Sequence, residues 1–268
     1  MQTINNLTFA FFLFICSGLT MFSQGISMSP TRLFFSGNPG ETLTKLVTLS
    51  NSSNNDYVFN VNTKDWKRDE DGNKLYFDAS TLEQSNSAWI STVESSINLP
   101  AKSTQEIIVT MRVPLDASNS EVTNSMLFFT QIGKQKDIAE LQTGIGIIAL
   151  FEFGLHVYYT PVSNNTKSLE IVSMEERTET NSVTRKVAVG IENDGNVVND
   201  ATVELELTNT TTGEEIKLNP TNISMIPGTK QVVEFELPKN ISGSYLGVSI
   251  IKMAGTNDLR VGEKNFEF

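Results

Sequence analysis

The sequence predicts an all-β protein made of two immunoglobulin-like β-sandwich domains that are joined by a short hinge. Short runs of alternating apolar and polar residues dominate the chain, and Asn, Gly, Asp, Ser and Pro interrupt them. These runs recur at spacings of roughly 8 to 15 residues, which is typical of β-sandwiches. The two halves also share a pattern, because residues 99–114 and 226–238 each combine a Pro-containing turn, an alternating strand and a final Pro. Such a repeat indicates two domains of one class.

The predicted strands are the runs that are rich in β-branched and aromatic residues. In the first half they cover residues 31–35, 44–50, 57–63, 73–77, 105–113, 125–132 and 144–161. In the second half they cover residues 168–176, 184–193, 201–209, 214–219, 230–238, 245–253 and 262–268.

Residues 1–23 are interpreted as a secretory signal peptide. An apolar run at residues 7–22 precedes Ser23, which lies near the expected cleavage site. Because Lys and Arg are missing before the apolar run, a short N-terminal anchor is the alternative. A lipoprotein anchored at Cys16 is a weaker alternative, since Ile15 stands where a small residue is expected.

The remaining chain divides at a polar segment, residues 163–168, which we interpret as the hinge. We expect an N-terminal immunoglobulin-like domain at residues 25–162 and a C-terminal one at residues 168–268. The signal peptide predicts an exported protein, located in the periplasm or, alternatively, at the cell surface.

The composition of the chain argues against a nucleic-acid partner and against disulfide bonds. The chain has 268 residues, a formal net charge of -11 and a pI near 4.7. This acidity argues against nucleic acid as a partner, because phosphate binding requires a clustered basic surface. The single cysteine, Cys16, lies in the leader, so the mature chain must fold without a disulfide.

The residue types that support catalysis are scarce in this sequence. The chain has one histidine, His156, and it lacks a Gly-x-Ser-x-Gly elbow, a phosphate-binding loop and zinc-ligand spacing. The oxygen-bearing side chains of Asp69, Glu70, Asp71 and Asn73 could suggest calcium. However, Asp71 and Gly72 form a strong hairpin-turn signal, and Gly72 stands too early for a calcium loop. We therefore expect no enzyme, no cofactor and no metal.

The segment at residues 144–161 is the most apolar run after the leader. A membrane span is disfavoured because Glu152 and His156 lie inside it. As a strand it would direct alternate side chains to opposite faces, and both faces are largely apolar. A strand of this kind is either central in a sheet or covered by a partner.

Three stretches of the first half resemble the periplasmic pilus-assembly chaperones (PapD-like). Residues 26–51 resemble their opening, with Pro-x-Arg, a Gly turn and a strand that ends in Asn. Residues 125–132 resemble the penultimate strand, and residues 147–161 resemble the last strand before an aromatic-x-Pro hinge. The resemblance spans roughly residues 25–161, and the second half matches in class and size.

This resemblance implies a chaperone that lends its last strand to a pilin-like subunit, with alternating apolar residues filling the subunit's groove. Ile147, Ala149 and Phe151 stand at the donor positions, and Ile145 and Phe153 extend the same face. Which of the strand's two faces points outward stays open, because a bulge near residue 154 would switch the alternation.

The resemblance also implies a basic pair that holds the carboxylate of the partner subunit. Arg32 matches the arginine of this pair, whereas His156 stands at the lysine position. The alternatives are a structural role for His156 and a salt bridge for Arg32.

Two functions remain open at this point. The first is an exported chaperone that binds pilin-like or other envelope subunits by β-strand addition. The second is a cell-envelope adhesion or interaction protein on the same scaffold. An exposed edge strand could also pair with itself in a homodimer.

Overall fold

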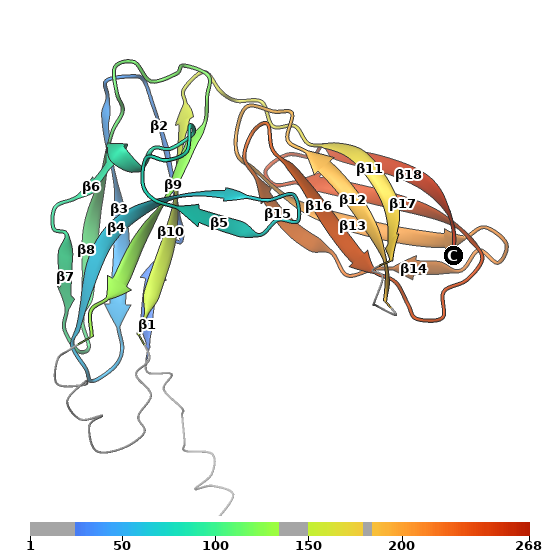
Figure 1. Ribbon diagram of the computed structural model, residues 1–268, viewed down its shortest axis with the longest axis horizontal. Coiled ribbons are helices and arrows are strands. Elements are labelled where there is room, and N and C mark those ends of the chain that lie inside the picture. Colours follow the sequence, from blue (N-terminus) through green and yellow to red (C-terminus); the bar gives the residue numbers. More distant parts are fainter. Residues whose placement is uncertain (1–24, 134–149, 179–183) are drawn as a thin grey trace, which may run out of the picture.

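The computed structural model describes residues 25–133, 150–178 and 184–268, and they form two β-sandwiches (Figure 1). The signal-peptide prediction and its alternatives lie outside these residues. None of the described residues belongs to a helix long and apolar enough to cross a membrane.

The N-terminal half consists of two facing sheets. One sheet has the strand order β1-β3-β8-β6, and the other has the order β2-β10-β9-β4-β5, with β7 also paired to β4. The elements are β1 (Ile26–Ser29), β2 (Arg32–Gly37), β3 (Thr42–Asn51), β4 (Tyr57–Arg68), β5 (Lys74–Phe77), the 3-10 turn η1 (Ser87–Trp89), β6 (Ile90–Thr92), β7 (Ser96–Leu99), β8 (Thr104–Arg112), β9 (Thr123–Gln131) and β10 (Glu152–Pro161).

The first strand-forming segment of this half changes sheets along its length. Its beginning, β1, pairs with β3, and its continuation, β2, runs parallel to β10 in the opposite sheet. Pro30 lies between the two parts and cannot donate a ladder hydrogen bond, so it separates them. The core between the sheets consists of buried apolar residues such as Phe35, Leu49, Phe59 and Phe129.

The C-terminal half repeats the architecture with sheets of order β11-β12-β16 and β14-β13-β17-β18, and β15 pairs with β13. Its separate core includes Val189, Leu205, Phe235 and Ile251. The elements are β11 (Glu170–Thr178), β12 (Arg185–Glu192), β13 (Asn199–Asn209), β14 (Glu215–Lys217), β15 (Thr221–Met225), β16 (Lys230–Glu236), β17 (Ser244–Met253) and β18 (Leu259–Glu267).

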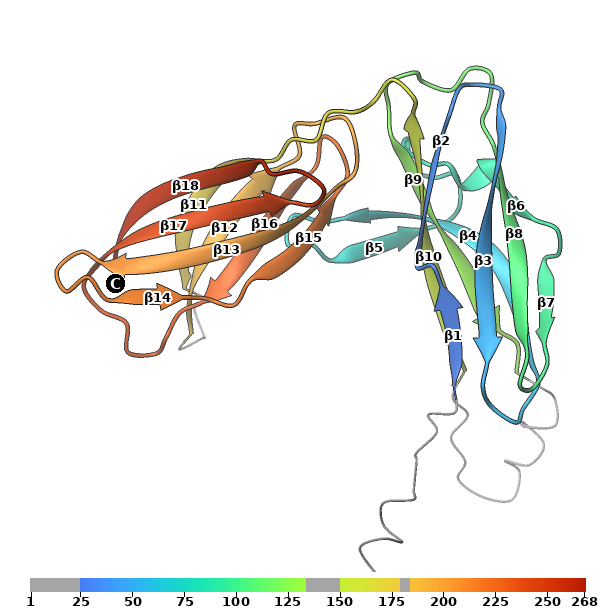
Figure 2. The same cartoon turned by 180° about the vertical axis from the view of Figure 1, so that it is seen from behind.

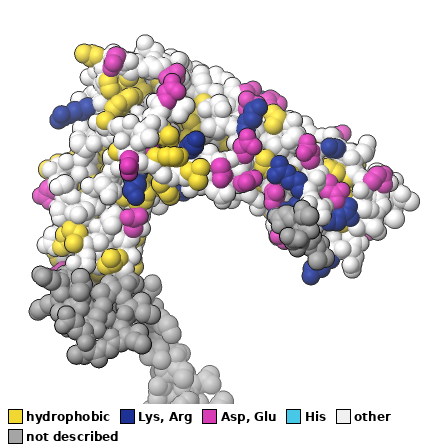
Figure 3. All heavy atoms as spheres, in the orientation of Figure 1, with side chains coloured by type: hydrophobic (Ala, Val, Ile, Leu, Met, Phe, Trp, Pro, Cys, Tyr) yellow, Lys and Arg dark blue, Asp and Glu magenta, His cyan; other side chains and the backbone are white. Residues whose placement is uncertain are grey.

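The two sandwiches meet at an angle, and the β4–β5 hairpin reaches from the first toward the second on the inside of this bend (Figures 1 and 2). We call this inner angle the elbow. On the face in Figure 3, hydrophobic side chains gather over the N-terminal half, and charged side chains are dense over the C-terminal half.

The all-β, two-sandwich prediction is confirmed, and the corrections concern individual strands. The sequence analysis missed β1, β6, β7 and β15, because strands of three to five residues show too little alternation to stand out. It ended the β4 strand at residue 63, whereas β4 continues to Arg68 because this charged stretch pairs with β5. The described part of the predicted 144–161 strand becomes β10 only from Glu152.

Candidate functional site

The first part of β10 lies at an open sheet edge. Along β10, β9 covers one edge from Glu152 onward, whereas β2 covers the other edge only from His156. Within the described ranges, no strand pairs with the second edge of residues 152–155. An edge of this kind presents backbone donors and acceptors to which another strand can bind.

The backbone groups that face this open edge can be identified. Gln131 N–H donates to the Phe151 carbonyl on the β9 side, at 2.8 Å, and His156 N–H donates to the Thr31 carbonyl on the other side, at 3.1 Å. Successive residues of a strand alternate in the direction of their N–H and C=O groups. Glu152 and Gly154 therefore direct their backbone groups toward the open edge.

The structure also establishes which side chains of β10 face the core. The register against β9 is continuous from Glu152 to Tyr159, so no bulge occurs at Gly154. Leu155 and Tyr159 are fully buried in the core, and the odd-numbered residues therefore face the interior of the sandwich. Gly154 lies on the other face, where Phe128 covers it: a Cβ there would come within 3.1 Å of that ring.

The two predicted donor residues that the structure describes, Phe151 and Phe153, lie on the core-facing side. Phe153 packs at the rim of the core in an edge contact with Phe59, at 6.0 Å between ring centroids, while Phe151 beyond it is 39% exposed. The two phenylalanines stack at 6.2 Å. Ile145, Ile147 and Ala149 lie outside the described residues.

The opposite face of β10 is buried inside the elbow. Trp66, Met126, Phe128 and Tyr158 form a third apolar cluster, against which Val198 and Ile226 of the C-terminal half pack. From Glu152 onward, the two faces of β10 therefore contact different clusters: Leu155, Val157 and Tyr159 belong to the core between the sheets, and Tyr158 belongs to the cluster inside the elbow. Trp66 thus packs in the interior, and its indole N–H donates to the Ser125 carbonyl at 3.2 Å.

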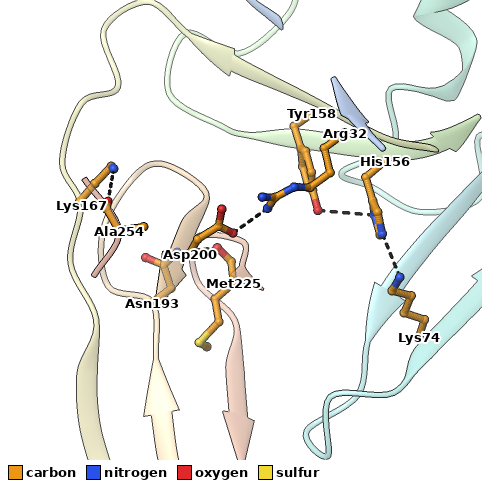
Figure 4. Close-up of polar contacts among 9 residues, drawn as sticks. All are labelled: Arg32, Lys74, His156, Tyr158, Lys167, Asn193, Asp200, Met225 and Ala254. Carbon is orange, nitrogen blue, oxygen red and sulfur yellow. Dashed lines mark hydrogen bonds and ion pairs between the residues drawn. The ribbon is translucent and has the colours of Figure 1, made fainter. Parts of the chain in front are cut away.

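Arg32 extends from β2 across the elbow to the C-terminal half (Figure 4). Its Nη1 donates to Asp200 Oδ1 at 2.7 Å, and the two side chains are 38% and 36% exposed. This hydrogen bond is the main reason that the pKa of Arg32 is raised. Burial alone would raise the pKa of Asp200, but the bond from Arg32 contributes to lowering it. In the structure, the arginine therefore holds a carboxylate of its own chain.

His156 faces the elbow next to Arg32, because the two residues are Cα partners in the β2–β10 register. Its ring lies 4.5 Å from the Trp66 ring and stacks on Tyr158. The pKa of His156 is lowered to about 3. Burial is the largest cause, and the positive charges of Lys74, Arg68 and Arg32 lower the pKa further. The imidazole is therefore neutral at pH 7.

Lys74 is the partner of His156 that sequence analysis missed. Its Nζ lies 2.9 Å from His156 Nε2 (Figure 4). An ammonium group only donates, so Nε2 accepts and the ring proton resides on Nδ1, where it faces the Tyr158 hydroxyl oxygen at 3.5 Å. The signal in the sequence is the pair of cations, Arg68 and Lys74, that flanks the hairpin turn.

A cleft of about 540 Å³ opens beside these groups between the two halves. Arg32 and Arg68 line it from the N-terminal side, and Asp200, Asn222 and Lys252 line it from the C-terminal side. The cleft therefore combines hydrogen-bonding groups with several cations, a chemistry that suits an anionic group.

No protein-family model and no curated protein sequence matches this chain. The solved structure of the class 5 fimbriae chaperone CfaA is similar, with a TM-score of 0.50, 14% identity and coverage of 90% of this chain and 99% of CfaA. The YadV chaperone aligns at 12% identity with a TM-score of 0.49, covering 90% of this chain and 99% of YadV. The CsuC–CsuE chaperone-tip adhesion subunit complex of Acinetobacter baumannii aligns at 10% identity with a TM-score of 0.48, covering 89% of this chain and 97% of the matched chain. The chain thus has the two-sandwich fold of the fimbrial chaperones.

Proposed function

We propose that the protein is an exported, non-catalytic chaperone that binds pilin-like or other envelope subunits by β-strand addition along β10. The observation that carries the proposal is the open edge at residues 152–155, where Glu152 and Gly154 direct their backbone groups away from the sandwich. Phe151 and Phe153 continue the core-facing side to the end of the sandwich, where they can enter an incomplete core of a partner. The chaperone fold agrees with this function.

Arg32 has a second role in the proposal. A guanidinium on the inside of the elbow can hold a carboxylate of the bound subunit in bidentate geometry. The bond from Arg32 to Asp200 supports this role, because it places a carboxylate oxygen 2.7 Å from the guanidinium. The subunit's carboxylate would replace that of Asp200.

The experiment uses a backbone change at the open edge. Glu152→Pro removes an N–H that faces outward, and proline is tolerated at the start of an edge strand. Glu152→Ala is the matched control, because it also loses the side-chain hydrogen bond from Thr130 but keeps the N–H. Tagged variants are compared in pull-downs from envelope extract, with mass spectrometry of the co-purifying proteins.

A small β-rich subunit at a ratio of about 1:1 should bind wild type and Glu152→Ala, and Glu152→Pro or Phe151→Asp should lose it. Equal binding by all four proteins would rule out strand addition along β10. If the protein that Glu152→Pro fails to recover is a second copy of this chain, the chain forms a homodimer that pairs through the same edge.

The second candidate function is an envelope adhesion or interaction protein that uses the same scaffold. The Arg32–Asp200 ion pair favours it, because the arginine is already engaged within the chain. In that case the loops would bind the partner, and neither Glu152→Pro nor Phe151→Asp would change the proteins recovered.

A further inference from the structure

The β4–β5 hairpin places two positive charges directly opposite each other. Arg68 and Lys74 are Cα partners in its register. Like charges at opposed positions of an antiparallel pair are destabilising. The chain has 31 acidic and 20 basic residues, so this pairing is unexpected. It suggests that the two cations serve a purpose other than stabilising the hairpin.

No acidic side chain in the described part of the chain lies within ion-pair distance of Lys74 or Arg68. Lys74 Nζ contacts the neutral His156 ring, and Arg68 Nη1 donates to the Gly72 carbonyl at 2.6 Å. The Nε of Arg68 is buried and has no hydrogen-bond partner within the described residues. Burial and the charge of Arg68 lower the pKa of Lys74. Among the described residues, both cations therefore lack a compensating anion.

The hairpin is held in place at its tip. Val232 N–H of the edge strand β16 donates to the Glu70 carbonyl at 2.7 Å. Gly72 has a φ of +84° and lies so close to Gln231 that a Cβ would come within 2.6 Å of its Nε2. The tip thus contacts the C-terminal half while the base belongs to the N-terminal sheet. This bridge fixes Lys74 and Arg68 over the elbow.

We propose that Lys74, assisted by Arg68, is the second cationic anchor for a carboxylate that binds in the elbow beside Arg32, and that His156 only orients the Lys74 ammonium. The inference rests on the proposed function in one respect: because the partner is a protein subunit, the anion is a carboxylate. On β10, His156 stands where the resemblance implies a lysine. The hairpin supplies the cation instead through Lys74, which lies 82 positions before His156.

His156 offers a direct reporter, because it is the only histidine in the protein. Its ring resonances are followed by NMR at low ionic strength while N-acetylglycine, a mimic of a terminal carboxylate, is titrated. N-acetylglycinamide is the uncharged control probe. The variants are Lys74→Met and Lys74→Arg, with Lys67→Met as the matched control, because Lys67 is a hairpin cation on the opposite face.

N-acetylglycine should shift the ring resonances saturably in wild type and in Lys67→Met, and the amide should not. Lys74→Met should weaken the affinity about tenfold, the value of one charge-assisted hydrogen bond at a partly exposed site, and Lys74→Arg should retain most of it. An equal response to acid and amide, no response to the acid, or unchanged affinity in Lys74→Met would each refute the anchor.

This test is independent of strand addition. If Glu152→Pro abolishes subunit binding while Lys74→Met leaves N-acetylglycine binding unchanged, the chaperone proposal stands and the Lys74 anchor fails. If N-acetylglycine binding depends on Lys74 while Glu152→Pro retains its partners, the elbow binds carboxylates without strand addition.

Discussion

The neutral state of the half-buried His156 ring makes the stability of the N-terminal half dependent on pH. The folded-state pKa is lowered to about 3, first by burial and then by the neighbouring cations, whereas the ordinary value is 6.5. Above about pH 6.5 the ring is neutral in both states, and the full stability is present. As the pH falls toward 3, only the unfolded chain takes up the proton, so stability is lost in this window.

The size of this stability loss follows from the difference in proton binding between the folded and unfolded states. Between about pH 7 and about pH 4.5, the preferential protonation of the unfolded state costs at most about 2.5 kcal/mol of unfolding free energy. The ring is partly exposed, so solvent screening reduces the expected loss to about 1.5 kcal/mol.

Urea unfolding followed by tryptophan fluorescence measures this loss. Both tryptophans, Trp66 and Trp89, belong to the N-terminal half, so the signal reports on that half. His156→Gln is the reference, because its amide oxygen can still accept from Lys74 but does not titrate. On acidification, the unfolding free energy of wild type should fall by about 1.5 kcal/mol more than that of this variant. An equal loss in both proteins would show that His156 does not titrate as argued.

Three further predictions concern contacts around the site. Tyr159→Phe removes the buried hydroxyl that donates to the Gly37 carbonyl at 2.9 Å, and urea unfolding should show a loss of about 1 kcal/mol; no change would mean that water replaces the bond. Asp65→Asn removes a buried carboxylate that accepts two loop amides and a serine hydroxyl, and it should lower the midpoint of urea unfolding by an amount equivalent to about 2 kcal/mol. Val232→Pro removes the N–H that donates to Glu70, so the hairpin amides should exchange faster in hydrogen-exchange mass spectrometry, whereas Val232→Ala should leave them unchanged.

The sequence was sufficient for the fold class because alternation and turn residues are local signals. The Asp71–Gly72 turn predicted the hairpin that joins β4 to β5. The face of β10 that enters the core could not be predicted, since a single bulged residue would have reversed it.

The site was harder to predict because it depends on packing between distant segments. Lys74 contacts His156 because β4 continues to Arg68 and pairs there with Lys74, and this continuation was hidden in a charged stretch that lacks apolar alternation. The Asp200 partner of Arg32 likewise comes from the other sandwich, 168 positions away. Both contacts join residues that are far apart in the sequence, so local sequence patterns cannot predict them.

The most direct test of strand addition is hydrogen exchange at the amides of Glu152 and Gly154. The purified complex with the captured subunit is compared with the free protein. Strand addition predicts that both amides exchange freely in the free protein and become protected in the complex, while the buried amides of β9 do not change. If both amides exchange equally fast in the two states, the subunit does not pair with β10, and the central claim is wrong.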